Sequence, residues 1–290
     1  FFPKEGLKNH IKVVVDASNG MAGTMVPKVF SDVKNLEIIP LNFDNTIGYF
    51  THEPNPLVDS NLDSLRDKVK SSGAHLGVCF DGDADRCAAI DEQGKTVGCD
   101  LHTAWLAPQL AGSGDAVIYD LRSSRVVREE IEKFGGVPVE GRVGHVFMKS
   151  ALAKHQAPFG GELSGHFYFG NNFNADSGAI AFAVTVATLS NSSLRMSECI
   201  NPLRRWSQSG EINFEVEDKK RAMESLVNVF EECKVHYLDG VTLEADSWWC
   251  NVRPSNTEPL LRLNLEARSS EEVEKMIGEV SSYLGIRVDH

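Results

Sequence analysis

Three aspartates, Asp81, Asp83 and Asp85, alternate with small residues in a short segment between two apolar runs. Carboxylates this close repel one another unless a hard cation lies among them, and oxygen-only ligation favours Mg²⁺ or Ca²⁺ over Zn²⁺. The apolar runs, 75–80 and 87–91, are too short for helices and are typical of strands. We therefore predict a loop between two strands that binds Mg²⁺ and leaves an open position for a phosphate oxygen.

Two other interpretations of this loop are possible. A solvated acidic turn is the simpler one. An EF-hand is the other, because Glu92 is the twelfth residue counted from Asp81. However, Arg86 occupies the sixth position, where an EF-hand needs glycine for its sharp turn. The flanking strands also argue against a helix–loop–helix.

Composition limits the class of protein. With 290 residues, 42% hydrophobic and 24% charged, the chain is expected to form two or three globular domains. A net charge of −12 without any basic run argues against nucleic acid or an anionic membrane as partner. No signal peptide and no apolar run of about 18 residues is present, so no membrane span is predicted. No signal for an oligomeric state was found.

The cysteines and the first residues give two further expectations. The six cysteines, at positions 79, 87, 99, 199, 233 and 250, include no C-x-x-C pair. They favour reduced thiols and a cytoplasmic location over disulfides. The sequence begins with Phe1-Phe2-Pro3 and enters a predicted strand by Ile11. We therefore expect it to come from inside a longer protein.

Strand and helix signals alternate along most of the chain. Over 1–98, predicted strands at 11–15, 36–41 and 76–80 are separated by helices, which indicates a mainly parallel α/β sheet. Ligand loops in such sheets follow the carboxyl ends of strands, where Asp81 lies. A second α/β series of similar rhythm fills 99–208. From 209 to 290, strands predominate and helices interrupt them. The predicted fold is two consecutive mixed-sheet α/β domains followed by a smaller α+β domain.

A glycine-rich segment, Gly160–His166, contains the polar residues Glu162, Ser164 and His166. Glycine allows the backbone to approach a ligand closely. In an extended loop, residues two apart point the same way, so Glu162 and Ser164 could bind adjacent sugar hydroxyls. A plain glycine-rich turn is the alternative.

Three other segments contain groups suited to phosphate. The turn at 253–259 (RPSNTEP) offers an arginine, hydroxyls, an amide and backbone N–H groups, although it could be an ordinary turn. Arg122 and Arg125 follow a predicted strand end, where exposed arginines beside a helix N-cap are the alternative. His145 is a candidate proton donor or phosphate contact, although a single histidine is more often structural.

In this order and at these spacings, the motifs resemble those of the α-D-phosphohexomutases, and within them the phosphomannomutase/phosphoglucomutase group. The resemblance extends over essentially all 290 residues and corresponds to the second, third and fourth of that family's four domains. It implies a Mg²⁺ cofactor, and hexose phosphates and hexose 1,6-bisphosphate as ligands.

The resemblance also implies roles for individual residues. Asp81, Asp83 and Asp85 would bind Mg²⁺, with Arg86 as their neighbour in the active site. Glu162 and Ser164 would bind sugar hydroxyls, with His166 nearby. The non-reacting phosphate would be held by Arg253, Ser255, Asn256 and Thr257. Arg122 and His145 would match basic residues close to the reacting centre.

The activity implied is transfer of a phosphoryl group between a phosphoserine and the 1- and 6-positions of mannose or glucose phosphates. Two departures from the family pattern stand out. Arg122 occupies a position where the enzymes compared have lysine, and a planar guanidinium that stays charged does not replace a lysine acid or base. The catalytic T-x-S-H-N-P loop is missing from these residues, and no histidine here follows a serine. We therefore expect the chain alone to be inactive.

Two other classes of protein remain as alternatives. One is a phosphosugar-binding protein without catalysis. The other is a Mg²⁺-dependent phosphatase of the haloacid dehalogenase kind with Asp81 as nucleophile, which the fifth-position Asp85 and the other motifs disfavour. A glucosamine substrate is less favoured than mannose or glucose, because those mutases usually have glutamine where Leu163 stands.

Overall fold

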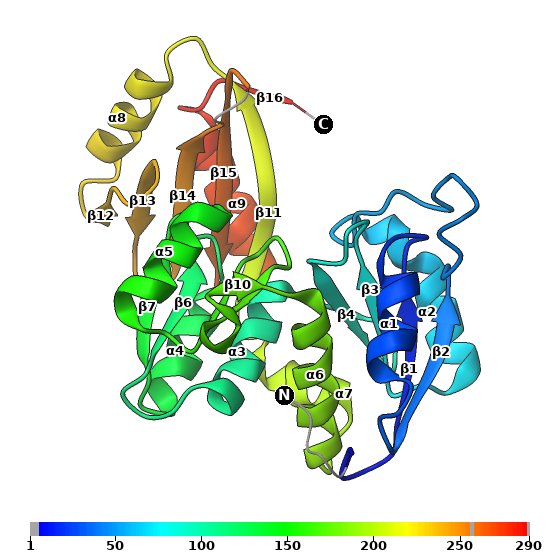
Figure 1. Cartoon of the computed structure of the whole chain (residues 1–290). Helices are drawn as coiled ribbons and strands as arrows, with labels where there is room; N and C mark the ends of the chain where they lie inside the picture. Colours follow the sequence, from blue (N-terminus) through cyan, green and yellow to red (C-terminus); the bar gives the residue numbers. More distant parts are fainter. Residues whose placement is uncertain (1–5, 256–257, 289–290) are drawn as a thin grey trace.

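The computed structural model describes residues 6–255 and 258–288 and contains three sheets, each formed by a continuous part of the chain (Figure 1). The first has the strand order β2-β1-β3-β4-β5, in which β1 pairs in parallel with β2 and β3, whereas β4 and β5 are antiparallel. Its elements are β1 (Ile11–Asp16), α1 (Ala22–Phe30), β2 (Leu36–Leu41), η1 (Asp59–Leu62), α2 (Asp63–Ser72), β3 (Leu76–Phe80), β4 (Cys87–Asp91) and β5 (Thr96–Val97).

The second sheet repeats this topology. Its order is β10-β9-β8-β6-β7, with β6 parallel to β7 and β8, and with β9 and β10 antiparallel. The elements are α3 (Cys99–Leu110), β6 (Ala116–Asp120), α4 (Arg125–Lys133), β7 (Val137–Gly141), α5 (His145–His155), β8 (Phe159–Gly161), β9 (Phe167–Phe169), η2 (Gly170–Asn172), β10 (Ala175–Asp176), α6 (Gly178–Asn191), α7 (Met196–Ile200) and η3 (Asn201–Leu203).

The third sheet is antiparallel, in the order β12-β13-β14-β15-β11-β16. Together with its helices it forms the predicted α+β domain, so the predicted fold class is confirmed. Its elements are β11 (Ser207–Glu215), α8 (Lys219–Val229), β12 (Lys234–His236), β13 (Val241–Glu244), β14 (Trp248–Pro254), β15 (Leu260–Ala267), α9 (Ser270–Ser281) and β16 (Ile286–Val288).

Most strands and helices agree with the sequence-based expectations, and the elements that were missed are short. β5 and β10 have two residues each, and β8, β9, β12 and β16 have three, which is too short for a hydrophobic period to appear. All six cysteines are free. Within the described residues, no helix is long and apolar enough to cross a membrane. The division of the chain at 98 and 208 remains a prediction.

Helix α6 lies between the first two sheets and joins their cores (Figure 1). Its sequence, GAIAFAVTVATLSN, is apolar on nearly every face, as expected for a helix buried on all sides. The fully buried Phe182 stacks edge-to-face on Phe30, with ring centroids 4.8 Å apart, and contacts Phe80 at 6.0 Å. One continuous cluster of buried side chains therefore includes Val13 of the first sheet and Phe159 of the second.

Glycines allow two backbone segments to press against the acidic loop. A Cβ added to Gly178, at the start of α6, would lie 2.6 Å from the carbonyl oxygen of Ala84. One added to Gly20 would lie 2.5 Å from the carbonyl oxygen of Gly82, close to where the N–H of Met21 donates to that same oxygen at 2.9 Å. Both approaches hold the acidic loop against the rest of the first domain and α6.

We predict that Gly178→Ala destabilises the protein by about 1–3 kcal/mol, because the new methyl group must displace a backbone carbonyl. Thermal unfolding followed by circular dichroism measures this. Gly278→Ala is the matched control, since Gly278 lies inside α9 with no atom within 4 Å of the added Cβ. Alanine there should stabilise by ~0.5–1 kcal/mol. A Gly178→Ala protein as stable as wild type would contradict the tight docking of α6.

Candidate functional site

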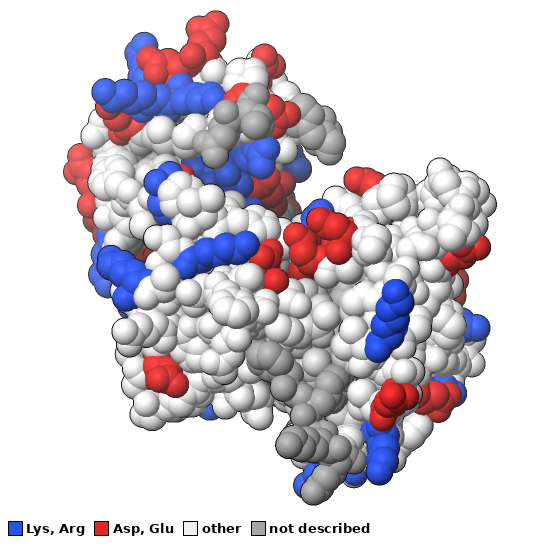
Figure 2. Space-filling view, in the orientation of Figure 1, with Lys and Arg blue, Asp and Glu red and all other residues white. Residues whose placement is uncertain are grey.

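The acidic loop and the glycine-rich loop occupy equivalent positions in the two repeated domains. The first joins β3 to β4 and the second joins β8 to β9. The loops meet directly: Arg86 and His166 form an isolated antiparallel bridge, and the N–H of Cys87 donates to the carbonyl of Gly165 at 3.1 Å. Figure 2 shows acidic side chains gathered beside the hollow that separates the first domain from the rest of the chain. Figure 1 places the end of β3 and the start of β4 at this hollow. Residues predicted for metal and for sugar therefore share one site.

The acidic loop forms a compact set of oxygen donors. Asp81, Asp83 and Asp85 each offer a carboxylate oxygen, and these oxygens lie within 4.8 Å of one another. Burial, and then the charge of Asp81, raises the pKa of the Asp85 carboxyl. A set of three carboxylates without nitrogen or sulfur fits Mg²⁺. The strands on both sides exclude an EF-hand, and the near-complete burial of Asp81 (2% exposed) excludes a fully solvated turn.

Arg86 holds Asp81 in place. Its Nε donates to Asp81 Oδ2 at 2.6 Å and its backbone N–H donates to Oδ1 at 3.1 Å. Both oxygens of Asp81 thus accept hydrogen bonds from Arg86, which fixes the orientation of this carboxylate in the loop. The turn places Ala84 at φ = 67°, a left-handed conformation that is costly for any residue with a Cβ. Such strain tends to occur where function requires a fixed loop shape.

Glu162 is buried, and several neighbouring groups donate hydrogen bonds to its carboxylate. Its Oε1 accepts from the backbone N–H of Gly144 at 2.8 Å, and its Oε2 accepts from the Tyr168 hydroxyl at 2.6 Å. Ser164 Oγ lies 3.4 Å from Oε2 and 2.8 Å from His166 Nδ1. Burial alone would raise the pKa of Glu162, but hydrogen bonds from His166, Tyr168 and Gly144 lower it to about 2. Glu162 is therefore an ionised, fixed acceptor at neutral pH.

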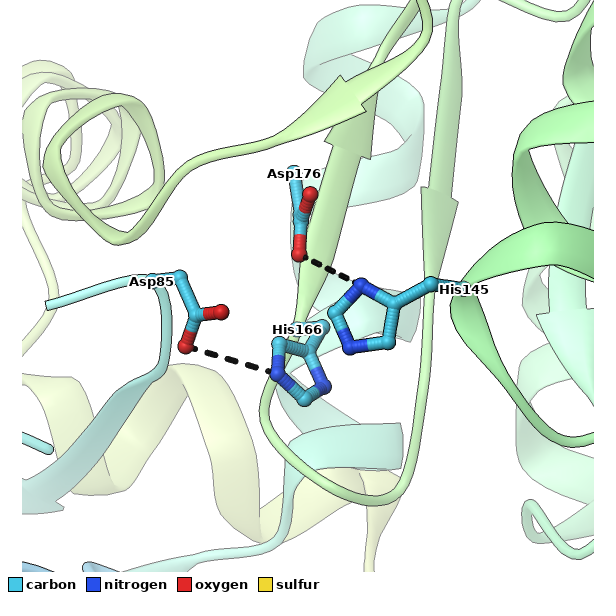
Figure 3. A group of neighbouring side chains, drawn as sticks. All are labelled: Asp85, His145, His166 and Asp176. Carbon is cyan, nitrogen blue, oxygen red and sulfur yellow. Dashed lines mark ion pairs between the residues drawn. The ribbon is translucent and has the colours of Figure 1, made fainter. Parts of the chain in front are cut away.

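His145 lies beside the glycine-rich loop, with its ring centroid 4.3 Å from that of His166 (Figure 3). Its Nδ1 is 3.0 Å from Asp176 Oδ2, and Lys149 Nζ is 3.0 Å from the other oxygen of Asp176. The sequence-based reasoning did not find Asp176 or Lys149. Asp176 is in the two-residue strand β10 and has no motif around it. Lys149 lies one helical turn after His145, which was the available signal.

The arginine predicted to bind phosphate is in a cluster around Glu211. Arg253 donates from Nη2 to Glu211 Oε2 at 2.7 Å, and Arg262 donates from Nη1 to Oε1 at 3.2 Å. Arg122 Nη1 is 3.6 Å from Oε2. Burial, then the nearby charge of Arg122, lowers the pKa of Arg253 even though Glu211 opposes this. The Glu211 carboxylate thus lies among three guanidinium groups. A phosphate group would be attracted to the same position.

The other residues of the predicted phosphate turn are only partly described. Ser255 is buried, and its hydroxyl lies 3.5 Å from a carboxylate oxygen of Glu258. Asn256 and Thr257 lie outside the described residues.

Arg122 and Arg125 differ in their surroundings. Arg122 forms a buried ion pair with Asp120, which together with Glu211 outweighs burial and raises the pKa of the guanidinium. Arg125 instead donates to the backbone carbonyls of Ala245, Asp246 and Trp248 in the third domain. Ser124 caps helix α4, as the alternative interpretation of this segment held, but Arg125 is half-buried against the third sheet and is not exposed.

The fold and the arrangement of the loops can be compared with those of known proteins. Family models for phosphoglucomutase/phosphomannomutase match the chain: α/β/α domain II over residues 4–94, α/β/α domain III over 97–205 and the C-terminal domain over 211–282. A phosphomannomutase of Methanocaldococcus jannaschii is 36% identical over 98% of this chain and 64% of its own length. The chain belongs to the phosphoglucomutase/phosphomannomutase family.

Further relatives give the same result. A phosphomannomutase of Vibrio cholerae is 35% identical over 90% of this chain and 58% of its own length. The chain therefore spans about three fifths of the length of these relatives. A phosphoglucomutase/phosphomannomutase family protein from Burkholderia thailandensis, 26% identical, superposes with a TM-score of 0.87 over 97% of this chain and 61% of its own.

A more distant solved structure shares the fold. It is the N-acetylphosphoglucosamine mutase of Aspergillus fumigatus in complex with GlcNAc-6P and magnesium. This enzyme has a TM-score of 0.69 and 17% identity over 97% of this chain and 67% of its own.

We predict that Glu211→Gln strengthens binding of inorganic phosphate several-fold, because the substitution removes a competing negative charge and keeps the side-chain volume. The measurement is calorimetric titration of phosphate at low ionic strength. Glu215→Gln is the matched control, since Glu215 lies on the same strand β11 and is exposed. Weaker binding in Glu211→Gln would show that Glu211 orients Arg253 and does not compete with the ligand.

Proposed function

We propose that this chain forms the metal-, sugar- and phosphate-binding domains of a phosphohexomutase, which interconverts the 1- and 6-phosphates of mannose and of glucose. The observation that supports this most is the direct contact of the acidic loop with the glycine-rich loop, through the Arg86–His166 bridge. It brings the predicted metal ligands beside the predicted sugar ligands. The relatives named phosphomannomutase, and the related fold solved with GlcNAc-6P and magnesium, favour hexose phosphates as ligands.

In this proposal each group has a separate task. Bound by Asp81, Asp83 and Asp85, Mg²⁺ would neutralise charge on the phosphoryl group being transferred. Glu162 accepts hydrogen bonds from sugar hydroxyls, and Ser164 supplies a further polar contact. Arg253 binds the phosphate that does not react. His166 and His145 lie closest to the acidic loop, where they can donate a proton or a hydrogen bond to the reacting oxygen.

Arg122 is proposed to act only by charge. Its ion pair with Asp120 and its place beside Glu211 keep the guanidinium ionised, so it can stabilise negative charge but cannot exchange a proton near neutral pH. Acid–base chemistry would then fall to the histidines. A phosphoserine, which the family reaction requires as phosphoryl donor, would have to come from outside these 290 residues.

We predict that the 290-residue chain alone has no mutase turnover, because no T-x-S-H-N-P loop is present to donate a phosphoryl group. The assay couples glucose 6-phosphate formation from glucose 1-phosphate, and the mannose equivalent, with a hexose 1,6-bisphosphate activator present. The full-length Methanocaldococcus jannaschii relative is the positive control. Turnover near that of the relative would contradict the prediction and require another phosphoryl carrier within these residues.

Arg253→Ala should weaken the binding of mannose 6-phosphate or glucose 6-phosphate. A charge-assisted hydrogen bond contributes ~1.5–3 kcal/mol, which corresponds to a loss of roughly ten- to a hundredfold in affinity. Arg253→Lys should recover only part of this loss, because a point charge cannot rebuild a two-pronged contact. Calorimetric titration of the three proteins measures the effect. Equal affinities of wild type and a folded Arg253→Ala protein would place the phosphate site elsewhere.

A further inference from the structure

A second group of metal-ligating side chains lies next to the acidic loop. It consists of Asp85, His145, His166 and Asp176, and one nitrogen or oxygen from each lies within 4.8 Å of those from the other three (Figure 3). His145 Nδ1 is 3.0 Å from Asp176 Oδ2, and His166 Nε2 is 3.4 Å from Asp85 Oδ1. Asp85 belongs to the first α/β domain, whereas the other three belong to the second.

The chemistry of this cluster differs from that of the acidic loop. Two imidazoles with two carboxylates are a donor set for Zn²⁺ or Co²⁺, whereas three carboxylates suit Mg²⁺. Tetrahedral Zn²⁺, with bonds of about 2.0–2.2 Å, separates its ligand atoms by about 3.3–3.6 Å. The two measured pairs are already near this spacing. No pair of these ligand atoms is more than 4.8 Å apart, so the remaining atoms have only a short distance to close around an ion.

Neighbouring groups orient the cluster. His166 Nδ1 is 2.8 Å from Ser164 Oγ and 3.5 Å from Glu162 Oε2. This leaves the other ring nitrogen, Nε2, directed towards Asp85, as in metal sites where a carboxylate fixes the imidazole from behind. The side chains of Asp85 and His145 are 35% and 43% exposed, which gives a cation access from solvent. Lys149 opposes a cation here, because its ammonium group pairs with the second oxygen of Asp176.

We propose that Asp85, His145, His166 and Asp176 form a second cation site that takes a transition metal of the Zn²⁺ class and is distinct from the Mg²⁺ site of the acidic loop. Because Asp85 belongs to both groups, an ion bound by the histidines withdraws a carboxylate from Asp81 and Asp83. It also ties the loop between β3 and β4 to the second domain. Zn²⁺ therefore opposes Mg²⁺ at the acidic loop. This inference concerns binding of the metal alone and holds whatever reaction the protein performs.

The experiment is a titration of the metal-free chain, without a histidine tag, with Co²⁺ followed by visible absorption. Four-coordinate Co²⁺ with imidazole ligands absorbs far more strongly in the visible than Co²⁺ surrounded by six oxygens. One strongly absorbing Co²⁺ per chain, displaced by one Zn²⁺, is the expected result. Loss of a group that only supports a metal ligand typically costs ~10–100-fold in metal affinity. Loss of a ligand itself should cost no less, so His145→Asn and Asp176→Asn should each weaken Co²⁺ binding at least about tenfold.

Two matched variants separate the two sites. Asp83→Asn alters the acidic loop only, so the Co²⁺ spectrum and affinity should stay as in wild type. Lys149→Met removes the opposing ammonium group and should tighten Co²⁺ binding. Circular dichroism checks that each variant is folded. The proposal is overturned if Co²⁺ gives no strong visible bands. It is also overturned if the bands and the Co²⁺ affinity are unchanged in His145→Asn and Asp176→Asn, whatever Asp83→Asn shows; their loss in Asp83→Asn would identify the acidic loop as the site.

Discussion

The burial of helix α6 between two sheets is the contact on which the rest of the structure depends. A helix that is apolar on nearly all faces cannot be covered by one domain, so the first two domains must pack on opposite sides of it. Full burial of a side chain such as Phe182 contributes about 1.5–3 kcal/mol, and its removal would leave a cavity between both cores. The start of the same helix presses on the acidic loop, which links core packing to the position of the candidate site.

Charge in the site is balanced locally rather than over the whole surface. Asp81 is paired with Arg86, Asp120 with Arg122, and Glu211 with Arg253 and Arg262. In an ion pair that is largely removed from water, loss of one partner leaves the other charge uncompensated, which is costly. A phosphate that binds Arg253 therefore competes with Glu211, which already pairs with that arginine. The affinity for a ligand then depends on how well it replaces that partner, and charge alone does not determine it.

Much of the fold could be predicted because its elements are long enough to show a hydrophobic pattern, as in β1, β2 and β3. The site was predicted where residues lie in one continuous motif, as with Asp81, Asp83 and Asp85 or Glu162 and Ser164. Glu211 and Asp176 were missed because they reach the site from other strands. Only the folded chain brings Glu211 of β11 to Arg253 of β14, across the single strand β15 that lies between them. The similar rhythm of the first two domains was predicted, but their shared strand order was not, because the two segments show no close sequence repeat.

The bridge between Arg86 and His166 has a consequence for how this site can change during evolution. Two hairpins from equivalent places in a repeated fold meet through backbone groups, so the contact depends on the length of each loop more than on its side chains. A residue inserted in either hairpin would shift the pairing and turn each following side chain to the opposite face. Substitutions leave the backbone contact intact. The contact between the two hairpins therefore tolerates substitutions but not insertions. Ligand specificity can diverge here while the fold stays the same.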